Sequence, residues 1–171
     1  HRPEESGKAN NPVLAFDLAN VNVANVRKAT LVLNIQECEL PKKWGPDGRQ
    51  ILVYPITQAW VEGNGQTLRT GQNEKTRGSG QGVTWFSPID TNIANKAPNG
   101  SGQWMGARPF LGPLTAPAVR VVNQQTGTIS FDVTRDIKAG YSQGWLMRKQ
   151  NESTFGNVRF YSKDYGNANL A

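Results

Sequence analysis

The sequence predicts an all-β protein, an antiparallel β-sandwich of jelly-roll type with two long loop excursions. Several short segments alternate apolar and polar residues with a period of two, which is typical of half-buried strands. The chain also holds 18 Gly and 10 Pro, which mark frequent turns. Helical periodicity appears only around Val133–Tyr141, for one or two turns. A length of 171 residues suits one core, so we expect a single β-sandwich domain over residues 1–171.

Two strands are expected in the first third of the chain. In Ala29–Glu37, alternate apolar residues face one side of the strand and Val32, Asn34 and Gln36 face the other. Ile51–Thr57 is a second strand, interrupted by Pro55, which favours an edge or a bulge position. A Gly-Pro-Asp-Gly turn at Gly45–Gly48 precedes it.

Three more strands are expected near the end of the chain, at Thr128–Thr134, Gly144–Lys149 and Asn157–Lys163. The first points Ile129, Phe131 and Val133 inward, and the last points Val158, Phe160 and Ser162 to one side. Residues 62–82 and 86–127 show no sustained period, and we interpret them as the two loop excursions.

The charge balance favours acidic partners. There are 19 Lys and Arg against 13 Asp and Glu, for a net charge of +6 and a pI near 9.7. No apolar run is long enough to span a membrane. The chain begins at His1 with no visible signal peptide, so we expect a processed or trimmed form.

Catalysis is not expected. One His and one Cys cannot build a common zinc site, and a triad would depend on His1 at the terminus. No spacing marks a glycosidase acid pair, and Thr134 with Asp136 is better explained as helix capping. Cys38 is alone, so we expect a buried thiol, with an intermolecular disulfide as the alternative.

No cofactor is expected, and calcium is only a weak possibility. The oxygen-rich turns at Asp47-Gly48 and at Asp90 with Asn92 are more simply ordinary Asx turns. The sequons at Asn99 and Asn151 permit glycosylation in a suitable host.

Aromatic residues beside basic ones are the best candidates for binding. Exposed aromatic rings stack on sugars, and Lys or Arg bind carboxylate or sulfate groups. Trp60 and Trp85 are expected in the core, whereas Trp44 lies in a turn and is the best exposed candidate. The glycan-binding candidates are Trp44, Lys42 and Lys43, with a basic-aromatic stripe of Arg159, Tyr161 and Lys163. The alternative for this stripe is an ordinary solvated sheet face. Nucleic acid is not an expected partner, because the basic residues are dispersed and no helix could read a groove.

Several phrases in collinear order resemble the DNRLRE-type (disaggregatase-related) β-sandwich domains of secreted microbial proteins. The phrases, which together span most of residues 13–166, are Phe16–Leu18, Ala29–Leu33, Val53–Thr57, Trp60–Gly63, Gly82–Trp85, Asp90–Asn95, Thr128–Thr134, Gly144–Lys149 and Val158–Asp164. The chain departs from the family's pattern in two ways. The cysteines of one branch are replaced around Phe86, Ser87 and Gly100, and the family's first and last strands are missing.

The resemblance implies an accessory domain without a general active site, outside the cell or on the cell surface. Some members of the family bind acidic polysaccharide such as alginate, so a carbohydrate-binding module for an anionic polysaccharide is the leading expectation. The alternative is a structural subunit of a surface fibre, sheath or matrix. Such a filament would be a homo-polymer, assembled by self-packing or by a neighbour donating a strand where one is missing. Trimmed ends would also explain the missing strands.

Overall fold

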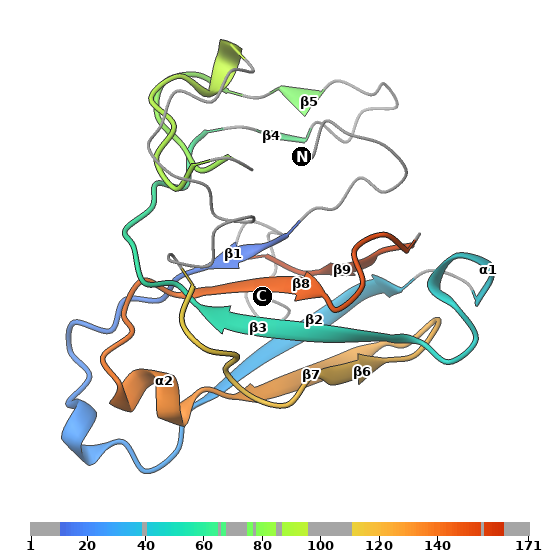
Figure 1. Ribbon diagram of the computed structural model, residues 1–171, viewed down its shortest axis with the longest axis horizontal. Helices are drawn as coiled ribbons and strands as arrows, with labels where there is room; N and C mark the ends of the chain where they lie inside the picture. The colour runs from blue at the N-terminus through green and yellow to red at the C-terminus, as the bar shows by residue number, and fades with distance from the viewer. Residues whose placement is uncertain are drawn as a thin grey trace. The chain divides into compact units, whose positions relative to one another are not determined.

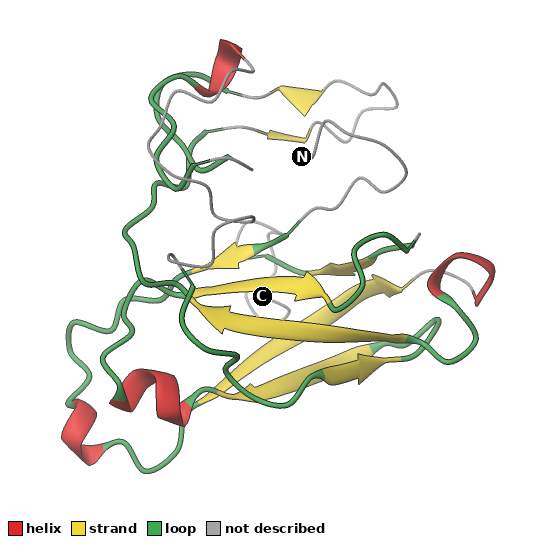
Figure 2. Ribbon diagram, in the orientation of Figure 1, coloured by secondary structure: helices red, strands yellow, loops and turns green. Residues whose placement is uncertain are grey.

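The computed structural model describes residues 11–38, 41–64, 66–67, 75–76, 78–84, 87–95, 111–154 and 156–162, with the backbone alone at 41–42, 66–67 and 75–76 (Figures 1 and 2). The elements are β1 (Val13–Leu14), η1 (Val23–Asn25), β2 (Thr30–Cys38), α1 (Pro41–Trp44), β3 (Arg49–Pro55), β4 (Gln66–Thr67), β5 (Lys75–Thr76), η2 (Ile93–Asn95), β6 (Val119–Val121), β7 (Gly127–Asp132), α2 (Thr134–Lys138), β8 (Trp145–Lys149) and β9 (Val158–Phe160). Strands therefore dominate and the helices are short, which confirms the all-β prediction (Figure 2).

The chain forms two compact units, Ile56–Gly112 and the remainder, and each is described by itself. The expected single domain stays a prediction, because compactness alone does not show whether the two units fold separately. No helix in the described ranges is long and apolar enough to cross a membrane.

The larger unit is built from two antiparallel sheets (Figure 1). The first, here called the β3 sheet, has the strand order β1-β8-β3-β6; the second, the β2 sheet, has the order β7-β2-β9. Both contribute to one hydrophobic core, in which Leu33 and Phe131 of the β2 sheet join Val53 and Met147 of the β3 sheet. Two sheets that enclose a common core form a β-sandwich, while the jelly-roll connectivity stays a prediction.

Strand β2 confirms its predicted alternation, because Leu31, Leu33 and Ile35 are buried and Val32 is exposed. Its pairing with β9 shifts register between Ile35 and Glu37. A β-bulge of this kind inserts one extra residue. The insertion brings Cys38 back to the inner face, where the thiol is buried as predicted and donates to the Val122 carbonyl at 3.3 Å.

Strand β3 corrects the prediction for Pro55. We expected an edge or a bulge, but β3 is an inner strand that lies between β8 and β6. Strand β6 pairs only with Arg49–Ile51, so Pro55 lies beyond that ladder, at the end of its own strand. The N–H that proline lacks is therefore not needed for any hydrogen bond between β3 and β6.

The closing strands and the short helix are largely as predicted. β7 buries Ile129 and Phe131, Val133 follows them into the core, and Val158 and Phe160 of β9 pack against it. The predicted second excursion, residues 86–127, is only partly loop because it contains β6. The predicted turn ends at Gly48, whose N–H donates to Gly45.

The unit Ile56–Gly112 contains the β4–β5 pair and η2. Reciprocal backbone hydrogen bonds join Gly82 and Asp90, at 2.8 and 3.0 Å. The first predicted excursion, residues 62–82, falls within this unit, and its described part contains the short strands β4 and β5 besides loop residues.

Candidate functional site

The outer face of the β2 sheet consists mostly of solvent-exposed side chains. The register pairs Thr30 with Asp132, Val32 with Ser130, Asn34 with Thr128 and Glu37 with Arg159. These eight residues, together with Tyr161, are called the β2 face below. All are exposed except Asn34 and Tyr161, which are half-buried, and Val32 is 53% exposed at the centre.

The outward residues of the β3 sheet are more covered. Leu52, Tyr54 and Arg148 are half-buried, and Leu146 is only 2% exposed. The β2 face is therefore the sheet surface of the sandwich on which a large ligand has room to lie.

Arg159 is the exposed cation of this face. Its side chain is 62% exposed and its Nη1 lies 2.7 Å from Oε2 of Glu37, whose side chain is 53% exposed. Ion pairs in such exposed positions contribute about 0–1 kcal/mol. A ligand carboxylate can therefore compete with Glu37 for the guanidinium at little cost.

Tyr161 lies directly after β9 and continues its pairing with β2. Its N–H donates to the Asn34 carbonyl at 3.0 Å, and the side chain is half-buried. The two described members of the predicted stripe are thus a half-buried aromatic ring and an exposed cation that is paired with Glu37. Its third member, Lys163, lies outside the described residues.

A second pair of opposite charges stands at the other end of the β2 face. The pKa of Asp132 is lowered chiefly by hydrogen bonds from the hydroxyl and then the N–H of Thr134, with a smaller attraction from Lys28. The N–H bond measures 2.9 Å. Asp132 is therefore an anion at neutral pH. The charged members of the β2 face are Arg159, Glu37 and Asp132, and the exposed Lys28 lies shortly before β2.

The exposure predicted for Trp44 is wrong. Its side chain is fully buried in the core, and its indole N–H donates to the Val121 carbonyl at 2.8 Å. The Lys149 ammonium lies 5.8 Å above the ring while donating to the carbonyls of Thr154 and Gly156 at 2.6 and 2.9 Å. A Trp buried with its N–H satisfied is a packing residue, so it cannot stack on a sugar.

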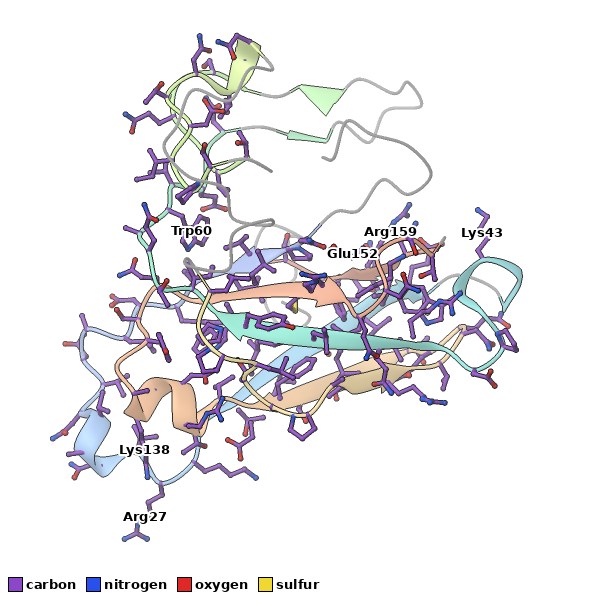
Figure 3. All side chains as sticks on the ribbon, viewed as in Figure 1. Arg27, Lys43, Trp60, Lys138, Glu152 and Arg159 are labelled. Atoms are coloured by element: carbon purple, nitrogen blue, oxygen red, sulfur yellow. The ribbon has the colours of Figure 1, made fainter. Side chains whose placement is uncertain are left out.

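The predicted platform of Trp44 with Lys42 and Lys43 is therefore not formed. Lys43 is exposed and points outward from α1 (Figure 3), whereas the side chain of Lys42 is outside the described part of the chain. Lys43 is therefore a surface cation, whereas Trp44, its predicted aromatic partner, lies in the core.

The carboxylates considered for catalysis have structural environments. The capping prediction for Thr134 and Asp136 is wrong, since the N-cap of α2 is Val133, without a side-chain hydrogen bond. Asp136 is fully buried, and one of its oxygens accepts from the Trp145 indole N–H at 2.9 Å. Its other oxygen has no hydrogen-bond partner, a costly state for a buried polar atom.

The calcium candidates show turn geometry. Asp90 accepts the Asn92 N–H at 2.9 Å, which confirms the Asx turn, and the Asp47 carbonyl accepts from Arg120 at 3.2 Å. Within the ranges that the structure covers, no cluster of three His, Cys, Asp or Glu side chains could hold a metal ion.

The remaining candidates are placed as follows. Trp60 is half-buried in the unit Ile56–Gly112, and Trp85 lies outside the described residues. Asn99 is also outside them, while Asn151 is exposed in a turn where its side chain accepts from Ser153.

No family model, curated protein or solved structure matches the chain. Arg159 and Tyr161 of the β2 face were singled out from the sequence, whereas its other members were not. Their alternation was visible, since Val32, Asn34, Ser130 and Asp132 occupy outward positions of their strands. The missing information was the pairing of β7 with β2, which joins residues almost 100 positions apart.

Proposed function

We propose that this protein is a non-catalytic, extracellular carbohydrate-binding module for acidic polysaccharide, and that the β2 face holds the glycan. One observation carries the proposal: a sheet face of mostly exposed residues on which short polar side chains flank Val32, with Tyr161 beside Asn34 and Arg159 opposite Glu37 at one end. The resemblance to secreted DNRLRE-type accessory domains supports the same role and a place at the cell surface.

The dimensions suit an extended chain. Thr30 and Glu37 mark the two ends of the face along β2, and strand residues advance about 3.3 Å each, so the face is roughly 20 Å long. Thr30, Asn34, Thr128 and Ser130 offer hydroxyl and amide groups along that length. Groups that both donate and accept suit the hydroxyls of a sugar chain.

The charges decide how an acidic glycan would bind. The cations Arg159 and Lys28 are balanced locally by Glu37 and Asp132, so the β2 face itself is not strongly basic. Anion affinity would come from the planar guanidinium, which matches a carboxylate in a two-point contact, and from the overall charge of +6. Both contributions weaken with salt.

Isothermal titration with alginate tests the proposal. We expect saturable binding that weakens as salt rises, with little binding to a neutral glucan. Val32→Glu, which puts a negative charge at the centre of the face, should reduce affinity at least tenfold, whereas Val32→Thr should not. Equal affinity of both variants, or equal binding of the neutral glucan at high salt, would overturn the proposal.

Arg159→Ala and Tyr161→Ala should each weaken binding without unfolding the protein, and Lys163→Ala tests the third member of the predicted stripe. Lys43→Ala is the matched control, because it removes an exposed cation from α1 rather than from the β2 face. A loss as large in Lys43→Ala would show that binding follows net charge alone.

The alternative, a subunit of a surface fibre or sheath, rests on the edge of the β2 sheet. Strand β7 is six residues long and is an edge strand of that sheet. Exposed strand edges are templates for a strand from another chain. Light scattering distinguishes the two functions, because a binding module stays monomeric at micromolar concentration and a fibre subunit polymerises.

A further inference from the structure

The end of the sandwich that carries η1 and α2 exposes apolar side chains. Phe16 is 53% exposed, Val21 39% and Val23 38%, and all three come from the segment between β1 and β2. Val21 closes a turn by donating its N–H to the Leu18 carbonyl, and Val23 begins η1, so both belong to the connection between β1 and β2 rather than to a strand. Figure 1 shows this blue segment beside α2 at one end of the two sheets.

Exposed cations lie on the same connecting segment and on the neighbouring helix α2. Arg27 and Lys28 follow η1 directly, and Arg135 and Lys138 belong to α2, which packs against η1. Figure 3 shows Arg27 and Lys138 projecting from the same end. Asp17 is the exposed carboxylate of these described segments, and Asp132 at the end of β7 lies two residues before α2, so four cations stand against two anions in this described region.

The loop that carries the apolar residues is held in place. The Val21 N–H donates to the Leu18 carbonyl at 3.0 Å, and Asn22 caps η1 by accepting from the Ala24 N–H at 3.1 Å. The Thr134 hydroxyl accepts from the Ala29 N–H at 2.9 Å and thereby ties the end of the loop to α2. Because the loop is already ordered, binding through it would lose little conformational entropy.

We propose that this end is a docking surface for an anionic lipid bilayer, separate from the β2 face. Apolar side chains on convex loops enter the headgroup region, and cations around them contact the negative headgroups. An acidic soluble polymer would engage the cations but would gain nothing from Val21 and Val23. The exposed apolar side chains and the cations occur together at this end, and this combination favours a bilayer over an acidic soluble polymer.

Co-sedimentation with vesicles tests the proposal, using phosphatidylcholine alone and phosphatidylcholine with 30% phosphatidylserine. We expect binding to the anionic vesicles only. A cation near such a surface contributes about a fivefold gain in affinity, so the double variant Arg27→Gln and Lys138→Gln should bind roughly 25-fold more weakly. The matched control, Lys43→Gln with Arg159→Gln, removes two exposed cations elsewhere and should change binding less than twofold.

Insertion of the apolar residues is tested separately. Val21→Cys, labelled with an environment-sensitive dye, should become brighter on anionic vesicles, while Lys43→Cys with the same dye should not. The single natural thiol, Cys38, is buried. Heparin should produce no such rise.

Failure to sediment with anionic vesicles at low salt would overturn the proposal, as would equal binding of the two double variants. Binding without a change in the dye at position 21 would also overturn it, because contact would then be purely electrostatic. The two proposals are tested with different variants, Val32→Glu and Tyr161→Ala for the β2 face and the Arg27, Lys138 and Val21 variants for this end. Either proposal can therefore fail while the other stands.

Discussion

Trp44 gives the clearest test of the core, because its sequence context suggested a binding residue and its environment shows a packing residue. Trp44→Ala removes a fully buried side chain, and truncations of this kind cost about 3–5 kcal/mol. Trp44→Phe keeps most of the ring but leaves the Val121 carbonyl without its indole donor, at a cost of about 1–3 kcal/mol. Both losses are large against a total stability of about 5–15 kcal/mol.

Urea unfolding followed by circular dichroism measures these losses. With a slope of about 2 kcal/mol per molar urea, Trp44→Ala should lower the midpoint by roughly 2 M and Trp44→Phe by about 1 M. Lys43→Ala, at the adjacent exposed position, should stay within about 0.5 kcal/mol of the parent. An unchanged midpoint for Trp44→Ala, or a folded Trp44→Phe protein that no longer binds alginate, would refute the packing role.

Two further predictions concern backbone and pH. Gly144→Ala should destabilise the protein about 2 kcal/mol more than Gly140→Ala, since overpacking costs about 1–3 kcal/mol. Both positions have positive φ, but a Cβ on Gly144 would overlap the Leu14 carbonyl oxygen, while a Cβ on Gly140 would meet open space. Equal unfolding midpoints would contradict this. The pKa of Asp132 is lower in the folded protein than its ordinary value of 3.8, so the ionised carboxylate stabilises the fold at pH values above 3.8. That stabilisation is lost as the pH falls through the pKa of the folded state. Thr134→Val should move the Asp132 pKa upward in an NMR titration, and an unchanged pKa would show that the hydroxyl has no influence.

Local patterns predicted the strands that have one buried face. In β2 and β7 the alternation of apolar residues identified the inward positions, because burial on one face of a sheet imposes a period of two. Strand β6 was missed because its three residues, of which Val119 is half-buried, Arg120 exposed and Val121 buried, are too few to reveal a period.

Position in the sheet could not be predicted from local signals. Pro55 indicated an edge, yet the short partner β6 lets it lie at the end of an inner strand. Trp44 was predicted to be exposed from its basic and turn-forming neighbours, but its burial depends on the Val121 carbonyl, 77 residues away. The β2 face likewise exists only through long-range pairing.

Mapping by NMR tests the central claim, glycan binding on the β2 face, most directly. Backbone amide shifts are followed while oligosaccharides of alginate are added to the isotope-labelled protein. We predict saturable changes that centre on Val32, Asn34, Ser130 and Arg159, with the half-buried Leu52 and Tyr54 on the other sheet unaffected. Changes confined to other surfaces, or no changes at millimolar oligosaccharide, would contradict the account.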